Sequence, residues 1–353
     1  MGTPSELAIL EVDLSAIINN WRDLCARHKG PVAAVLKADA YGLGAAQVAP
    51  ALFAAGCRHF FVALLNEALE IRNLVPGAML AVLNGMLPGT EDIYRSQAID
   101  PVLGSLDELR RWAGQGPALL HIDTGMARLG LEEAELTQLA ANPDLLHGLQ
   151  PRYVMTHLVS AEEPDDPINH HQRTRFARAR AMLPQTAASF ANSSGIFLGD
   201  DFASDLARPG AALYGLNPTP GKPNPMRPTF RLRARVLQVR ELAAGDSVGY
   251  NATWRAIRPS RIAVIGVGYA DGWARALSSR GHALFDGTRV PLVGRVSMDI
   301  STFDATDHPA LVAGAWLELI GPSHPPDVVA QEAGTNGYEI LTSLGRRYQR
   351  VYR

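Results

Sequence analysis

Short apolar runs recur along the first 220 residues of the chain, and most of them are separated by stretches with helical periodicity. Residues 32–36 form one such run, and residues 66–74 and 107–114 repeat their apolar positions at the spacing of an amphipathic helix. The eight runs predict strands at residues 32–36, 60–64, 79–83, 99–103, 118–122, 152–156, 187–190 and 205–208.

The spacing of these runs predicts the architecture. Strands that alternate with helices are expected to be parallel and joined by right-handed crossovers. The starts of the eight runs are separated by a mean of about 25 residues, close to the roughly 30 residues per unit of a TIM barrel. We therefore predict an α/β fold with a (β/α)8 TIM-type barrel over residues 1–220, in which the chemistry belongs at the C-terminal ends of the strands.

The pattern changes after a proline-rich segment at residues 217–228. Residues 231–242 alternate with period two, residues 261–270 form a buried apolar run, and residues 282–296 predict two strands around an Asp286–Gly287 turn. Helical patterns return only at residues 327–333 and 338–344. We predict that residues 221–353 form a mostly β C-terminal domain.

The N-terminal segment predicts one strand and one helix. Leu7 to Val12 form a short strand, which is a candidate to join the β domain, and Asp13 is expected to cap a helix that runs to about Arg27. The first ten residues have no basic region and too short an apolar run for a signal peptide.

Composition and charge exclude several classes of protein. The 353 residues are 47% hydrophobic and 19% charged, with a net charge of −2 and no basic cluster, so neither nucleic acid nor a membrane is an expected partner. Cys25 and Cys57 lie in apolar, helix-like stretches without metal-ligand spacing, so we expect core residues rather than a disulfide or a metal site. A cytoplasmic protein is predicted.

Lys37 stands at the end of the first predicted strand, in the sequence AVLKADAYGLG. Apolar surroundings disfavour an ammonium, so a lysine at the end of a buried strand tends to be a nucleophilic amine that can form a Schiff base with pyridoxal phosphate. A lysine that extends into solvent is the alternative. Tyr41, Gly42 and Gly44 favour a site, because the turn adds a hydroxyl and allows close backbone approach.

Two later loops match the phosphate site of a TIM barrel, which is formed after strands seven and eight. The seventh strand leads into ANSSG, which contains Ser193, and the eighth leads into RPGAALYG, which contains Gly210 and Ala211. Ordinary caps and turns would explain either loop alone, but together with Lys37 they favour pyridoxal phosphate. Arg208 lies at the end of the eighth predicted strand, at the same end of the barrel, and would keep a pyridine nitrogen unprotonated if it faced one. A structural salt bridge is the alternative role for this arginine.

Other candidates follow the fifth and sixth strands and lie in the β domain. Arg128 could pair with a substrate carboxylate, and His157 could bridge between Arg208 and another group. Tyr250 is presented between a glycine and an asparagine, and Met298 lies in a turn that could offer a backbone N–H. Packing is the simpler interpretation of a lone histidine or tyrosine.

The chain resembles the alanine racemases in a series of motifs, which occur in the order AVLKADAYGLG, HIDTGMARLG, ANSSG, RPGAALYGLNP, VGYNATW, GYADGW and GRVSMD and span nearly the whole chain. The resemblance implies a pyridoxal-phosphate-dependent isomerase that interconverts L- and D-alanine and supplies D-alanine for peptidoglycan. It also implies a homodimer with shared active sites.

The resemblance implies a role for each candidate residue. Lys37 holds the cofactor and is the base for D-alanine, and Tyr250 is the base for L-alanine. Arg208 faces the pyridine nitrogen, and His157 links Tyr250 to Arg208. The cofactor phosphate and the substrate carboxylate are bound by the remaining candidates, which are Tyr41, Ser193, Gly210 and Ala211 for the phosphate and Arg128 and Met298 for the carboxylate.

Three positions depart from the commonest pattern of this family. His121 stands where many members have a carbamylated lysine that braces the substrate-binding arginine. Ser189 stands where some members have a histidine near Arg208. Arg346 takes the place of a phosphate-side tyrosine, for which Tyr348 is a displaced candidate.

Two-base chemistry agrees with the resemblance, because racemisation removes an α-proton from one face and returns one to the other. A racemase of serine or another small amino acid remains an alternative, as does a pyridoxal-phosphate amino-acid decarboxylase, which would release carbon dioxide. A non-catalytic cofactor carrier would need Lys37 but neither Tyr250 nor the β domain.

Overall fold

The computed structural model describes residues 7–142, 144 and 148–353. Residues 1–6, the start of the segment that we expected to lack a signal peptide, lie outside the described residues. The chain divides into two compact units, one formed by Ile17–Arg227 and the other by Met1–Ala16 together with Pro228–Arg353. Each unit is described by itself.

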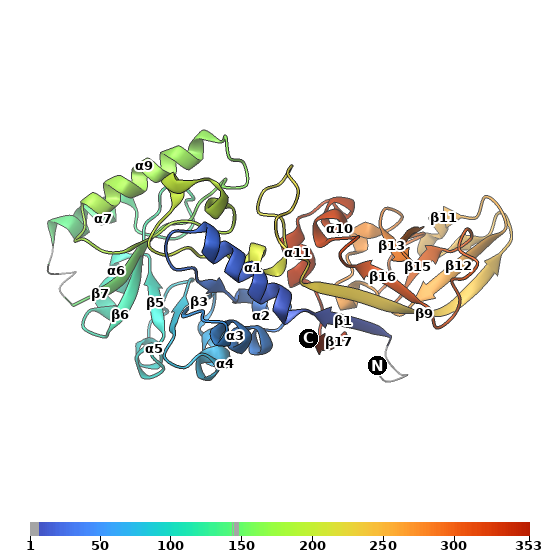
Figure 1. Cartoon of the computed structure of the whole chain (residues 1–353), viewed down its shortest axis with the longest axis horizontal. Helices are drawn as coiled ribbons and strands as arrows, with labels where there is room; N and C mark the ends of the chain where they lie inside the picture. Colours follow the sequence, from blue (N-terminus) through green and yellow to red (C-terminus); the bar gives the residue numbers. More distant parts are fainter. Residues whose placement is uncertain (1–6, 143, 145–147) are drawn as a thin grey trace. The chain divides into compact units, whose positions relative to one another are not determined.

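The unit Ile17–Arg227 is built on a parallel sheet whose seven strands follow one another in chain order (Figure 1). The strands are β2 (Ala34–Val35), β3 (His59–Val62), β4 (Met79–Val82), β5 (Asp100–Leu103), β6 (Pro117–His121), β7 (Gln150–Met155) and β8 (Ala188–Ser189). Each corresponds to one of the first seven predicted runs. The parallel order agrees with the crossovers expected from the alternating pattern.

The eighth predicted strand closes the sheet into a barrel through single bridges. Leu206 forms a parallel bridge with Ser189 of β8, and Ala207 forms one with Val32, just before β2. The Ala33 and Ala207 backbones add hydrogen bonds, from Ala33 N to Ala207 O at 2.9 Å and from Ala207 N to Pro31 O at 3.0 Å. The (β/α)8 barrel is therefore confirmed, with an eighth strand reduced to an extended segment.

Helices surround the barrel strands in Figure 1, as the predicted alternation requires. They begin at polar caps in several cases: Asp13 Oδ1 accepts a hydrogen bond from Ala16 N at 2.8 Å, and Ser105 Oγ accepts one from Glu108 N at 3.3 Å. The helices described in this region are α1 (Leu14–Arg27), α2 (Lys37–Tyr41), α3 (Ala45–Ala54), α4 (Leu65–Ile71), α5 (Glu91–Ser96), α6 (Leu106–Trp112), α7 (Glu133–Ala141) and α9 (Pro167–Ala181), with the 3-10 turns η1 (Arg72–Leu74), η2 (Ser194–Phe197), η3 (Asp200–Phe202) and η4 (Ala211–Tyr214).

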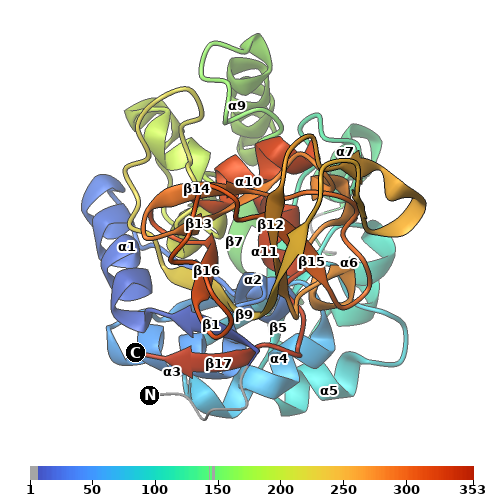
Figure 2. The same ribbon diagram turned by 90° about the vertical axis from the view of Figure 1, so that its right-hand side faces the viewer.

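The other unit is mostly β, as predicted, and contains an eight-stranded sheet (Figure 2). Its strands are β1 (Ala8–Val12), β9 (Phe230–Leu242), β12 (Ser260–Ile265), β13 (His282–Phe285), β14 (Thr288–Pro291), β15 (Ser301–Asp304), β16 (Trp316–Ile320) and β17 (Gln349–Tyr352). A smaller pair is formed by β10 (Ser247–Val248) and β11 (Trp254–Arg255). The helical elements are η5 (Tyr250–Ala252), η6 (Tyr269–Asp271), η7 (Arg275–Leu277), α10 (Pro326–Ala333) and α11 (Gly337–Thr342).

The long strand β9 organises this sheet, because it pairs antiparallel with β1, β12 and β16. The N-terminal strand β1 therefore belongs to the β unit and also pairs in parallel with β17. The predicted hairpin is confirmed: Asp286 (φ 48°) and Gly287 (φ 78°) connect β13 to β14 with the two positive φ angles of a type I′ turn.

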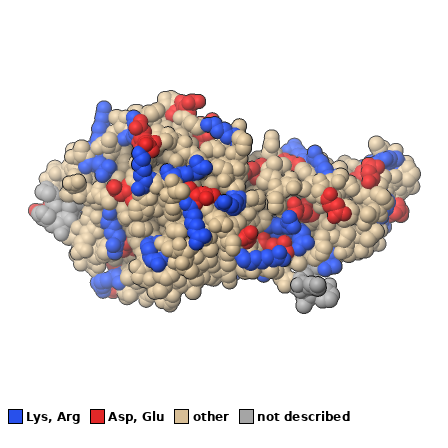
Figure 3. Space-filling model, viewed as in Figure 1, with Lys and Arg blue, Asp and Glu red and all other residues tan. Residues whose placement is uncertain are grey.

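Both cysteines are free thiols: Cys25 lies in α1, whereas Cys57 lies between α3 and β3 rather than in a helix. Burial raises the pKa of the Cys25 thiol to about 11 and that of Cys57 to about 12. On the face shown in Figure 3, Lys and Arg side chains are interspersed with Asp and Glu. Within the described residues, every helix is too short or too polar to span a bilayer.

Candidate active site

Lys37 begins a turn of left-handed helix at the C-terminal end of the first barrel strand. The four residues after it, Ala38, Asp39, Ala40 and Tyr41, all have φ between 53° and 56°. These four residues all carry a Cβ, and Gly42 (φ 81°) and Gly44 (φ 98°) follow them with positive φ angles as well. A left-handed conformation costs residues with a Cβ roughly 1–2 kcal/mol each, so the turn must be held by its surroundings.

Two carboxylates that accept backbone hydrogen bonds hold this turn. Glu67, at the start of α4, accepts a 2.6 Å hydrogen bond from Ala38 N through Oε1, while its Oε2 accepts from Ala63 N at 2.8 Å and Leu64 N at 3.0 Å. Asp39 Oδ1 accepts from Ala45 N at 2.7 Å, which ties the turn to the start of α3. Glu67 thereby links the segment after β2 to the segment after β3.

The electrostatic surroundings of Lys37 favour its neutral amine. Burial lowers the pKa of the Lys37 ammonium, and the positive charge of Arg128 lowers it further, whereas the negative charge of Glu67 opposes both effects. A neutral amine is the form that attacks a carbonyl carbon. The sequence-based expectation of a nucleophilic lysine therefore has a physical basis in the folded barrel.

The two predicted phosphate loops meet beside Tyr41. Ser193 Oγ accepts hydrogen bonds from Gly210 N at 3.0 Å and Ala212 N at 3.2 Å, so the loop after β8 contacts the start of η4, which begins at Ala211. A Cβ placed on Gly210 would overlap the Tyr41 hydroxyl. Position 210 therefore requires glycine, and the four residues predicted to bind phosphate lie together.

Arg208 is a buried cation between two strands. Its Nη1 donates a 2.5 Å hydrogen bond to Ser189 Oγ, and its Nη2 donates a 2.6 Å hydrogen bond to Thr156 O. Only 4% of the residue is exposed, and burial lowers the guanidinium pKa to about 10. The structural salt bridge that we weighed for Arg208 is not formed with any carboxylate in the described part of the chain.

Two histidines stand next to this cation and are neutral at pH 7. Burial and the charge of Arg208 lower the pKa of His157 to about 3 and that of His121 to about 4. Arg128 lowers both values further, and Asp123 partly opposes the shift at His121. His121, Arg128, His157 and Arg208 therefore form one electropositive group near the C-terminal ends of the barrel strands.

Arg128 lies on a loop that a single carboxylate organises. Asp123 Oδ1 accepts hydrogen bonds from Gly125 N and Met126 N, both at 2.9 Å, and Asp123 Oδ2 accepts one from Ala127 N at 3.0 Å. Arg128 is exposed and lines a cavity of about 1040 Å³ between this loop and α9. Lys37 is not among the residues that line this cavity.

Tyr250 and Met298 lie on the β unit and are exposed. The exposed fraction is 69% for Tyr250 and 54% for Met298, and Tyr269 and Ile300 are exposed hydrophobic residues in the same unit. The loops that carry these residues are connected, because Tyr269 N donates to Ser297 O and Ala270 N donates to Met298 O, both at 3.0 Å.

The C-terminal candidates differ in exposure. Arg346 is exposed, whereas Tyr348 is buried and burial raises the pKa of its hydroxyl. The Tyr348 hydroxyl makes no hydrogen bond with the residues that the structure describes.

Comparison with known proteins decides the family. Residues 12–218 match the model of the alanine racemase N-terminal domain, and residues 229–352 match that of the C-terminal domain. The chain belongs to the alanine racemase family.

Two relatives and one solved structure show how close the match is. An alanine racemase of Acidiphilium cryptum is 58% identical over 97% of this chain and 98% of its own length. A catabolic alanine racemase of Mesorhizobium japonicum is 48% identical over 98% of this chain and 93% of its own. The crystal structure of alanine racemase from Bartonella henselae, with covalently bound pyridoxal phosphate, has a TM-score of 0.95 and 42% identity and covers 98% of this chain and 99% of its own.

Glu67 and Asp123 are the residues that sequence reasoning missed in this racemase fold. Asp123 had a local signal, since an aspartate two residues before a glycine favours an Asx turn. Glu67 had a weaker one: it is the second residue of the predicted helical stretch at residues 66–74, and a glutamate near the start of a helix is typical of a capping box. Its bond to Ala38 spans 29 residues and could not be inferred from local patterns.

Proposed function

We propose that this chain is a pyridoxal-phosphate-dependent alanine racemase that interconverts L- and D-alanine. The observation that carries the proposal is the position of Lys37, a partly buried amine whose pKa is lowered, in the same strand-end face of the barrel as Arg208. The high identity of the racemase relatives supports alanine as the substrate and does not favour a decarboxylase.

The residues of the barrel fit the cofactor. Gly210 has no Cβ, which lets the Tyr41 hydroxyl approach its backbone closely, and Ser193 presents its hydroxyl to the same loop. We propose that these residues and Ala211 hold the phosphate, while Lys37 holds the cofactor covalently. When bound, pyridoxal phosphate acidifies the α-proton of the substrate by withdrawing electrons. Arg208, as a fixed cation, would keep the pyridine nitrogen without a proton.

The substrate would be positioned by charge and its proton moved by two residues. Arg128 is exposed and lies on an ordered loop, so we assign it to the substrate carboxylate, together with the Met298 backbone N–H. Lys37 takes the α-proton of D-alanine, and Tyr250 takes that of L-alanine. His157 would link Tyr250 to Arg208. Burial and the charge of Arg208 lower the pKa of His157, so its imidazole is neutral.

We propose a homodimer in which Lys37 of one subunit and Tyr250 of the other complete each active site. The support is that Tyr250 is 69% exposed and lies on the β unit, which has other exposed apolar residues, whereas Lys37 lies on the barrel unit. We further propose that the enzyme works in the cytoplasm, where the two free cysteines would stay reduced, and supplies D-alanine for peptidoglycan.

An assay of D-amino acid formation from a panel of L-amino acids tests the proposal. The purified protein with pyridoxal phosphate is expected to form D-alanine from L-alanine faster than it forms D-serine or any other product, and Lys37→Ala is expected to abolish the activity. Faster formation of D-serine would reassign the substrate. Carbon dioxide release from a basic amino acid without any D-product would identify a decarboxylase instead.

A further inference from the structure

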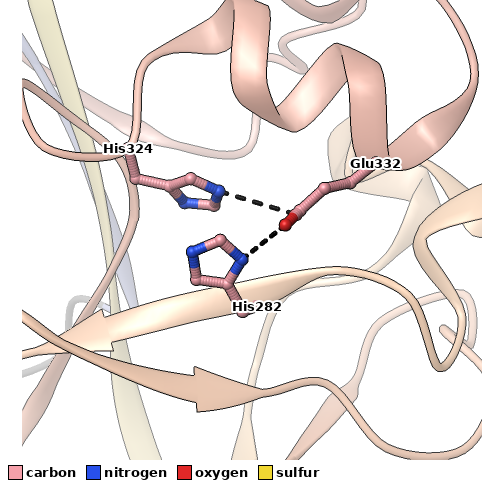
Figure 4. A group of neighbouring side chains, drawn as sticks. All are labelled: His282, His324 and Glu332. Carbon is pink, nitrogen blue, oxygen red and sulfur yellow. Dashed lines mark hydrogen bonds and ion pairs between the residues drawn. The ribbon is translucent and has the colours of Figure 1, made fainter.

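Two histidines and a glutamate, none of which has an assigned role in the racemase reaction, meet in the β unit (Figure 4). His282 is the first residue of β13, His324 lies in the turn before α10, and Glu332 lies in α10. One donor atom from each lies within 4.8 Å of the others. His282 Nδ1 is 2.6 Å from Glu332 Oε1, and His324 Nε2 is 3.6 Å from Glu332 Oε2.

The cluster has donor atoms without normal hydrogen bonds. His324 is 1% exposed, yet among the described residues neither its ring nitrogens nor Glu332 Oε2 makes a hydrogen bond of normal length and angle. Buried polar atoms are nearly always paired, so a group of unpaired ones requires an explanation. The figure shows His324 and His282 both directed at the Glu332 carboxylate, so the unpaired atoms face a common point.

A shared proton does not satisfy this cluster. One proton can join His282 Nδ1 to Glu332 Oε1, but it leaves Glu332 Oε2 and both nitrogens of His324 unpaired. The two imidazole rings are also only 3.9 Å apart, centre to centre. A neutral imidazole is the form that binds metal ions.

We propose that His282, His324 and Glu332 form a binding site for a divalent transition metal ion of the zinc class. Two imidazole nitrogens and one carboxylate are a known zinc ligand set that leaves the fourth tetrahedral position to water. Metal–ligand distances near 2.1 Å place tetrahedral ligand atoms about 3.4 Å apart. The observed distances from the Glu332 carboxylate oxygens to His282 Nδ1, 2.6 Å, and to His324 Nε2, 3.6 Å, lie on either side of that value.

The surroundings allow an ion to enter and suit a structural role. The Glu332 side chain is 15% exposed, and the only charged side chain that ion-pairs with it in the described part of the chain, Arg289 at 3.6 Å, is itself largely exposed and can turn into solvent. His324 is held by a tight turn, since Gly321 and His324 exchange backbone hydrogen bonds of 3.0 and 3.1 Å. A bound ion would therefore connect β13, this turn and α10.

Sequence patterns do not predict this site, because its three residues are separated by 42 and 8 positions and do not have the spacing of a metal-ligand motif. Only the folded β unit brings them together.

Zinc titration of the untagged, cofactor-loaded protein tests the site. The protein is dialysed against a chelator and then titrated with zinc chloride, with a chromophoric chelator as the competitor. We expect one tight site per chain in the wild-type protein. Glu332→Gln and His324→Asn should each weaken it by more than about 100-fold, which is the upper range for loss of an outer-shell partner. His308→Gln, which removes a histidine of the same unit outside the cluster, should leave the affinity unchanged.

Two results would overturn the proposal: no stoichiometric zinc binding by the wild-type protein, or equal zinc affinity in the wild-type, Glu332→Gln and His324→Asn proteins. Anomalous scattering at the zinc edge from zinc-soaked wild-type crystals provides a test that needs no variant. A peak bounded by His282, His324 and Glu332 is expected, and a peak elsewhere or no peak would contradict the assignment.

Discussion

The guanidinium of Arg208 donates a 2.5 Å hydrogen bond to the hydroxyl of Ser189, a neutral partner. Its second acceptor, the carbonyl of Thr156, is also neutral. Burial lowers the Arg208 pKa only to about 10, so the side chain is charged at neutral pH. Arg208 is therefore a fixed positive charge that no described carboxylate neutralises, which suits a residue that keeps a pyridine nitrogen without a proton.

Arg208→Glu is expected to change the outcome of the reaction. A carboxylate at this position would favour a protonated pyridine nitrogen, which strengthens electron withdrawal and allows side reactions. The ratio of pyruvate to D-alanine formed from L-alanine should rise by at least about tenfold, equivalent to about 1.4 kcal/mol. Ser189→Ala keeps the positive charge and should leave the ratio near that of the wild-type protein. An unchanged ratio in an Arg208→Glu protein that still binds cofactor would remove Arg208 from this role.

Glu67 stabilises the left-handed turn after Lys37, and its removal should be costly. Glu67→Ala leaves the backbone N–H groups of Ala38, Ala63 and Leu64 without their acceptor. We expect a loss of about 1–3 kcal/mol in the free energy of unfolding, measured by urea denaturation, together with lower cofactor occupancy. Glu70→Ala, on the exposed side of the same helix, should change stability by less than about 0.5 kcal/mol. Equal effects of the two substitutions would show that Glu67 does not hold the turn.

Acidification should destabilise the protein partly through His121. Its folded pKa is about 4, while the unfolded value is near 6.5, so the unfolded chain binds a proton that the folded chain does not. The contribution of His121 to stability is therefore present above pH 6.5 and is lost as the pH falls toward 4, by up to about 1.4 kcal/mol per pH unit.

His121→Gln should remove this contribution, so its free energy of unfolding should fall less steeply than that of the wild-type protein between pH 6.5 and 4. Arg208, Arg128 and Asp123 face the imidazole and are present in both proteins, so the difference in slope isolates His121. Urea denaturation of the cofactor-free proteins at several pH values measures it. Parallel curves for the two proteins would show that His121 is not held neutral.

Local patterns predicted most of the fold. The eight barrel runs, the Asp286–Gly287 hairpin and the helix after Asp13 all depend on signals within a few residues, and each is present in the structure. The eighth run was predicted to form a full strand, but in the structure it forms only single bridges to its neighbours. An apolar run indicates burial, but it does not show how many hydrogen bonds the segment makes to neighbouring strands.

The candidate site was less predictable, because its parts are far apart in sequence. Lys37 and the phosphate loops could be found by their place at strand ends, whereas the left-handed conformation of Ala38 and its bond to Glu67 depend on a contact between neighbouring barrel strands. The pairing of Arg208 with Ser189 likewise spans 19 residues, and the histidine cluster of the β unit spans 50.

Mixed dimers test the shared active site. Lys37→Ala and Tyr250→Ala proteins, each expected to be nearly inactive, are dissociated, mixed and reassociated. If the two bases come from different subunits, a mixed dimer has one site with both substitutions and one intact site. Random mixing should then restore about a quarter of the wild-type activity. Mixed dimers confirmed by mass that show no racemase activity would rule out the shared site.

Deuterium exchange at the α-carbon tests the two-base account most directly. In deuterated water, the wild-type protein should convert either enantiomer of alanine into an equal mixture of both, with deuterium at the α-carbon. Tyr250→Phe retains Lys37, so it should introduce deuterium into D-alanine without inverting it and should leave L-alanine unlabelled. Labelling of both enantiomers at equal rates by Tyr250→Phe, or labelling of L-alanine alone, would contradict the assignment of Lys37 and Tyr250 to opposite faces of the substrate.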